Sequence, residues 1–153
     1  MAASILYESG VFELGDVFYL ACTLCNPPKH KYFVVAQTQP LRMLLINSEV
    51  NSFVLNKPRR HALHLSLLRS SHDFLQRDSY LACDHLSHEY SQVQLLGLLE
   101  TDPSIRRGRI HDSVRPQIAS AFANNHLIAR KYLNELMPLW EAWLDGGSVE
   151  DPS

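Results

Sequence analysis

The chain has 153 residues, and its composition of 46% hydrophobic, 9% aromatic and 20% charged residues is typical of a globular domain rather than of a disordered chain. The formal net charge of −2 excludes a generally basic nucleic-acid binder. Two local basic clusters, in residues 57–60 and 106–109, are still able to hold a short single strand.

Residues 14–90 have the pattern of a β-rich unit. Six short apolar runs, rich in β-branched, aromatic and aliphatic residues, follow one another at intervals of about ten residues. These runs are 17–24, 32–36, 43–46, 53–55, 63–68 and 79–83. Prolines separate several of them, because proline cannot donate to a strand ladder. The pattern predicts a small barrel or sandwich of five to six mostly antiparallel strands.

The rest of the chain, about residues 91–144, has the pattern of helices. The apolar segment 93–99 fits either a strand end or a short helix, and Asp112 and Ser113 are able to cap the helix that follows them. A last helix has apolar positions that include Trp140. We expect that helix to pack on the β unit rather than to present an exposed stripe to a partner.

Together these segments predict an α+β fold with C-terminal helices packed on the β unit. We assign residues 1–145 to a single domain, with the β part at about 14–90 and the helical part at about 91–144. Residues 146–153 are expected to form a flexible acidic tail.

The motifs of several enzyme classes are missing from the sequence. It has no Walker loop, dinucleotide fingerprint, zinc-protease motif or serine-hydrolase elbow. The stretch that holds Cys83, His85 and His88 contains zinc-type ligands, but their spacing matches no known finger, so we predict a polar loop, no metal site and no cofactor. The alternative is a metal-dependent hydrolase that uses the His85 and His88 region, whose activity EDTA would abolish.

The three cysteines are an odd and small number, which fits a reducing compartment better than a disulfide framework. Cys22 and Cys25 form a CxxC motif that ends a strand and opens no helix, so we expect buried, inert thiols rather than a redox pair. No apolar run approaches the roughly 20 residues of a membrane helix, and residues 1–10 do not resemble a secretory signal. These features predict a cytoplasmic protein that does not contact a membrane.

A basic loop precedes the second predicted strand. Its residues Lys29, His30 and Lys31 could hold phosphate and transfer a proton at the mouth of a barrel, although a solvated hairpin loop has the same composition. Ser48 follows the third predicted strand. If strands two and three are antiparallel neighbours, Lys31 and Ser48 lie side by side.

Three segments in chain order resemble the MazF/PemK-type toxin endoribonucleases. They are the Gly15-Asp16 pair before the first strand, the basic residue that opens the apolar run 31–35, and the run 44–47. The stretch 72–84 looks like a variant branch with a His-x-Phe motif before a Ser-Tyr strand. The resemblance covers about residues 14–130 and implies an SH3-like β-barrel with helices. It also implies a homodimer that cleaves single-stranded RNA and that an antitoxin protein inhibits.

The resemblance suggests roles for individual residues. Lys31 stands where the family usually has an arginine, and it lacks the bidentate fork of a guanidinium. Ser48 falls near the family's Ser or Thr, and His72 is this branch's own candidate, with Asp73 next to it to orient the imidazole. In such a metal-independent reaction Lys31 stabilises the phosphoryl oxygens, Ser48 positions the phosphate, and His30 or His72 transfers the proton.

The expected RNA-binding residues are Lys29, Arg59, Arg60 and Arg77. The alternative is a non-catalytic SH3-like module that binds RNA or a protein. Lysine in place of arginine and the near-neutral net charge favour that alternative.

Overall fold

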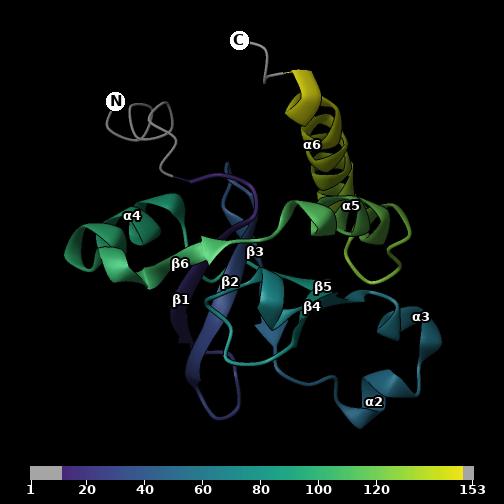
Figure 1. The fold of residues 1–153 in the computed structure, drawn as a ribbon, viewed down its shortest axis with the longest axis horizontal. Coiled ribbons are helices and arrows are strands. Elements are labelled where there is room, and N and C mark those ends of the chain that lie inside the picture. The colour runs from purple at the N-terminus through teal and green to yellow at the C-terminus, as the bar shows by residue number, and fades with distance from the viewer. Residues whose placement is uncertain (1–11, 150–153) are drawn as a thin grey trace.

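The computed structural model describes residues 12–149, with side chains through residue 142. The fold is α+β: a six-stranded antiparallel sheet curls into a half-barrel, and helices from the C-terminal part of the chain pack on it, as the sequence predicts (Figure 1). The strands are β1 (Asp16–Cys22), β2 (Lys29–Gln37), β3 (Arg42–Asn47), β4 (His64–Leu67), β5 (Ser79–Ser87) and β6 (Arg106–Arg109), arranged in the order β4-β5-β3-β2-β1-β6. The helices are α2 (Ser52–Leu55), α3 (Pro58–His61), α4 (Gln92–Thr101), α5 (Arg115–Ala123) and α6 (Arg130–Val149), with short 3₁₀ turns at Arg69–Ser71, Pro103–Ile105 and Asp112–Val114.

The strand register decides which residues meet at the end of the sheet. Tyr19 of β1 pairs with Tyr32 of β2, and Tyr32 pairs in turn with Ile46 of β3. The start of β2 therefore lies beside the end of β3, as expected for antiparallel neighbours.

One face of the sheet packs against α5 and α6. Alternate side chains of β1, β2 and β3 meet apolar side chains of the two helices in a continuous core, whose members include Val17, Val34, Leu44, Ile118, Phe122 and Leu136. Trp140 of α6 is fully buried, and its indole N–H donates to the carbonyl of Ala36 over 2.9 Å. The last helix thus packs on the sheet through its Trp140 face, as predicted.

The opposite face of the sheet is covered by α4. Phe18, Phe33 and Met43 form a second apolar cluster there with Leu95 of α4. In Figure 1, α4 lies on one side of the sheet and the α5–α6 pair on the other. The segment 93–99 is therefore helical, and the Ser91 and Gln94 side chains cap the start of α4 reciprocally.

Three expectations about local structure are wrong. Residues 53–55, predicted as a strand, form α2, where the Asn51 side chain accepts from the Val54 N–H over 2.9 Å. Residues 106–109, which lie in the part predicted to be helical, form the edge strand β6. Helix α6 continues to Val149, so residues 146–149 are helical rather than a flexible tail. Residues 150–153 of that predicted tail lie outside the described residues.

No helix among the described residues is long and apolar enough to span a membrane.

Candidate functional site

A cleft of about 670 Å³ opens where β2 begins and β3 ends. The loop before β5 forms its third wall. Its polar and charged lining includes Lys29, His30, Lys31, Asn47, Ser48 and Arg77. The sequence analysis assigned five of these six residues to RNA binding or cleavage, and the structure brings those five together. The sixth, Asn47, had no predicted role.

The sheet register places the two lysines and the polar end of β3 in this cleft. Because Tyr32 pairs with Ile46, the next positions along the two strands are Lys31 and Asn47. The Lys31 amine donates a hydrogen bond to Oδ1 of Asn47. Lys31 and Ser48 therefore line the same cleft, and the amine's partner on β3 is the residue before Ser48.

The cleft has an excess of positive charge. Lys29, Lys31 and Arg77 face one carboxylate, that of Glu49, which lies 3.6 Å from Arg77 in a pair that is exposed on both sides. Such an exposed pair contributes little to stability, so Arg77 can exchange it for an anionic ligand at small cost. Burial, and then the charge of Lys29, lower the pKa of Lys31. A bound phosphate would relieve the repulsion between the two ammonium groups.

His72 lies outside the cleft lining and is only 2% exposed. Its Nε2 accepts from the backbone N–H of His111 over 3.1 Å, so Nδ1 carries the hydrogen and donates to the carbonyl of Leu68 over 2.8 Å. The imidazole is therefore oriented by the Leu68 carbonyl and not, as predicted, by Asp73. With both ring nitrogens bonded to backbone groups, His72 joins two loops and has no nitrogen available for proton transfer.

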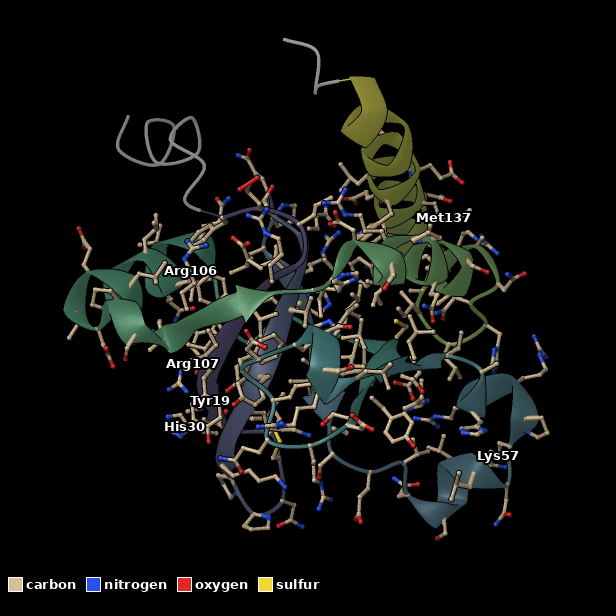
Figure 2. The ribbon with its side chains drawn as sticks, in the orientation of Figure 1. Tyr19, His30, Lys57, Arg106, Arg107 and Met137 are labelled. Atoms are coloured by element: carbon tan, nitrogen blue, oxygen red, sulfur yellow. A yellow bond between two sulfur atoms is a disulfide. The ribbon has the colours of Figure 1, made fainter. Side chains whose placement is uncertain are left out.

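Of the two histidines assigned to proton transfer, the structure therefore brings only His30 to the cleft. His30 is exposed, and its ring centroid lies 5.3 Å from that of Tyr19. Both residues are at the same end of the β1–β2 hairpin, whereas Lys57 lies on the α2–α3 segment across the molecule (Figure 2).

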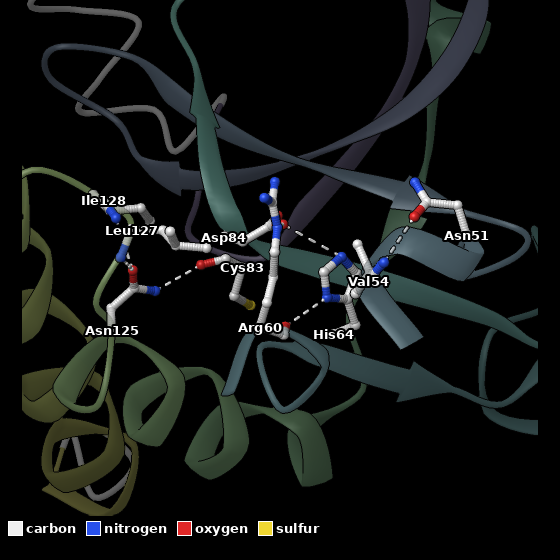
Figure 3. Close-up of polar contacts among 9 residues, drawn as sticks. All are labelled: Asn51, Val54, Arg60, His64, Cys83, Asp84, Asn125, Leu127 and Ile128. Atoms are coloured by element: carbon white, nitrogen blue, oxygen red, sulfur yellow. Dashed lines mark hydrogen bonds and ion pairs between the residues drawn. The ribbon is translucent and has the colours of Figure 1, made fainter. Parts of the chain in front are cut away.

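Arg59 and Arg60 also lie away from the cleft. Nε of Arg60 donates to Oδ2 of Asp84 over 2.9 Å, and Nε2 of His64 approaches the same oxygen at 3.5 Å (Figure 3). Arg59 lines a separate cavity of about 710 Å³, formed by residues of α3, β4 and α5. These two residues, predicted to bind RNA together with Lys29, thus belong to other parts of the surface.

The cysteines differ from expectation. Cys22, the last residue of β1, forms a disulfide with Cys25 in the turn that follows, where inert free thiols were predicted. Cys83 is a free, fully buried thiol, and burial raises its pKa. Among the described residues, no group of three or more His, Cys, Asp or Glu side chains gathers in a way that could hold a metal ion.

Two aromatic residues of the cleft were missed by sequence reasoning. Tyr19 and Tyr32 are cross-strand neighbours with ring centroids 4.9 Å apart, and the Tyr32 hydroxyl donates to the carbonyl of Phe74 over 2.9 Å. Period-two alternation along β2 puts Tyr32 on the same face as His30. That pattern was a signal for Tyr32, but Tyr19 joins the site only through strand pairing.

No family model and no curated protein matches the chain. The resemblance to the MazF/PemK-type endoribonucleases therefore stays a prediction from the sequence.

Proposed function

We propose that the protein is a metal-independent endoribonuclease of the MazF/PemK type that cuts single-stranded RNA in the cleft between β2 and β3. The proposal depends on one observation: the cationic start of β2 and the polar end of β3 line one cleft that also contains an exposed imidazole. A phosphodiester requires cations for its oxygens, and its cleavage requires groups that move protons nearby.

The proposed reaction is attack of a ribose 2′-oxygen on the adjacent phosphorus. His30 takes the proton of the 2′-hydroxyl, the new oxygen–phosphorus bond forms, and the bond to the 5′-oxygen breaks. Lys31 donates a proton to that leaving oxygen, and its lowered pKa makes it a better acid than an ordinary lysine. Lys29 and Arg77 stabilise the charge on the phosphoryl oxygens, and Ser48 positions the phosphate. The products are a 2′,3′-cyclic phosphate and a free 5′-hydroxyl.

A second candidate function is a non-catalytic module that binds RNA or a protein through the same cleft. Two observations favour it: His72 lies outside the cleft, and the Lys31 amine already donates a hydrogen bond to Asn47. Both features reduce the number of groups that are ready to transfer protons.

The resemblance extends the proposal to the setting of the protein. We propose a cytoplasmic homodimer that an antitoxin protein inhibits. In a reducing cytoplasm the Cys22–Cys25 disulfide would exist as two thiols.

The test is incubation of the purified protein with a long single-stranded RNA in the presence of EDTA. We expect fragments with cyclic phosphate ends, and a loss of rate of about 10²-fold or more in His30→Ala protein. Lys31→Ala should lose both cleavage and binding. Arg59→Ala is the matched control, because it removes an exposed cation that lies outside the cleft.

Two results would separate the alternatives. Intact RNA that binds the wild-type protein but not the Lys31→Ala variant supports the non-catalytic module. Activity that EDTA abolishes contradicts the metal-independent reaction, and equal RNA binding by wild type and Lys31→Ala contradicts both functions.

A further inference from the structure

A row of cationic and aromatic side chains continues from the cleft across β1 to the edge strand β6. The guanidinium carbon of Arg107 lies 4.7 Å from the centroid of the Tyr19 ring. On the β2 side, the Tyr19 ring has the His30 and Tyr32 rings as neighbours, at 5.3 and 4.9 Å. Figure 2 shows Arg107, Tyr19 and His30 one after another on the same side of the molecule.

A β-bulge aims Arg107 at this ring. Val17 of β1 pairs with Gly108, while the next residue, Phe18, pairs with Arg106, so Arg107 is the extra residue of β6. Bulges turn a side chain away from the regular pleat. Nε of Arg107 also donates to the carbonyl of Ser104 over 2.8 Å, which fixes the guanidinium over Tyr19.

Arg107 differs in its surroundings from the arginines on either side of it. Arg106 and Arg109 bond to the buried carboxylate of Asp16, at 2.7 and 3.1 Å, and so tie β6 to β1. Arg106 also lies over a ring, 5.1 Å from the centroid of Phe18, but that ring is fully buried. The exposed guanidinium of Arg107 instead lies over Tyr19, whose ring lines the cleft. Arg106 and Arg109 therefore hold the strand together, whereas Arg107 has the geometry of a recognition residue.

We propose that Tyr19, His30 and Arg107 form a stacking site for a nucleobase next to the phosphate in the cleft. The proposal rests on the proposed function in one respect, that the cleft binds the phosphate of a nucleic acid. Tyr19 and His30 line the cleft themselves, so a base stacked on them belongs to a nucleotide whose phosphate can reach Lys29 or Lys31.

This geometry selects a single strand. Aromatic rings and guanidinium planes bind the π-face of any base, and that face is covered by neighbouring bases inside a duplex. The strand would run from the end of β3 past the start of β2 and over β1 towards β6. The ligand class is thus a single-stranded oligonucleotide, bound by stacking with little preference for sequence.

The experiment compares two probes that the protein cannot cleave by 2′-oxygen attack. One is a single-stranded deoxyoligonucleotide, and the other is inorganic polyphosphate, which has charge but no bases. Removing a stacking ring in Tyr19→Leu should weaken oligonucleotide binding by about 5- to 100-fold, as expected for one stacked base. Polyphosphate binding should stay at the wild-type level. Arg107→Ala should weaken oligonucleotide binding more than polyphosphate binding, because it removes a stacking plane as well as a charge. Tyr19→Phe should bind both probes normally, and Lys31→Ala should weaken both.

The same data show which idea fails. If Tyr19→Leu and Arg107→Ala bind the oligonucleotide as the wild type does while Lys31→Ala does not, the base site is refuted and the phosphate cleft stands. If Tyr19→Leu weakens both probes equally, the ring supports the cleft rather than a base, and the inference is also refuted. If Lys31→Ala has no effect on either probe, the proposed function fails with it. Urea unfolding of each variant confirms that the comparison is made on folded protein.

Discussion

Replacing His72 with alanine tests whether this histidine is structural or catalytic. The ring is buried, and its two nitrogens bond to the Leu68 carbonyl and the His111 N–H. Alanine leaves both backbone groups without a hydrogen-bond partner. Each unpaired group lowers the free energy of unfolding by about 1–3 kcal/mol when no water takes the place of the ring nitrogen. The lost edge contact with the Phe74 ring, 5.8 Å between centroids, adds to this. Because His111 is exposed and water can reach part of the gap, we expect a total loss of about 2–4 kcal/mol.

The assay is urea unfolding, with RNA cleavage or oligonucleotide binding measured on the same samples. A loss of this size lowers Tm by about 10 °C in a domain of this length, while activity per folded molecule should not change. His72→Asn should lose about half as much stability, because its amide N–H can donate to Leu68 while its shorter side chain does not reach the His111 N–H that now donates to Nε2. The reasoning is refuted if His72→Ala unfolds at the wild-type urea concentration but cleaves RNA about 10²-fold more slowly, since that is the signature of a proton-transfer group.

Two further predictions concern charge and thiols. The pKa of Lys31 is lowered from 10.5, so the affinity of the protein for a deoxyoligonucleotide should begin to fall at a pH below that value. The Lys31→Arg variant stays charged and should keep its affinity to higher pH. Identical pH profiles of the two proteins would contradict this prediction. In denatured protein kept without reductant, a thiol reagent should find one thiol, Cys83, and three after reduction of the Cys22–Cys25 disulfide. Three thiols before reduction would show that the disulfide is absent.

The position of the cleft could be predicted from the sequence because it depends on short-range connections. A short turn between two consecutive apolar runs makes them antiparallel neighbours, and this places the residue that opens one strand beside the residue that ends the other. The shared position of Lys31 and Ser48 at one end of the sheet follows from that rule alone. The capping box that starts α4, Ser91 followed three residues later by Gln94, is a local signal that would have decided for a helix at 93–99, where the sequence analysis left a strand end open.

Other elements could not be predicted because their local sequence is ambiguous. The run 53–55 is apolar and short, and such a run fits a strand or a helix equally well until a neighbour is known. It forms α2, in which Val54 is buried while Phe53 and Leu55 are exposed. Strand β6 has no apolar alternation, and pairing with β1, together with the ion pairs of Asp16, holds it in place.

The sequence by itself determined the α+β class and, once strands two and three are taken as antiparallel neighbours, the charged end of the sheet, because periodicity and turns act over a few residues. Only the tertiary structure decided the roles of individual side chains. His72 became a support for two loops and Arg60 a partner of Asp84, while Tyr19 and Arg107 came together from positions far apart in the chain. A side chain's chemistry depends on the groups that fill its hydrogen bonds and cover its faces, and those groups come from distant segments that no local pattern specifies.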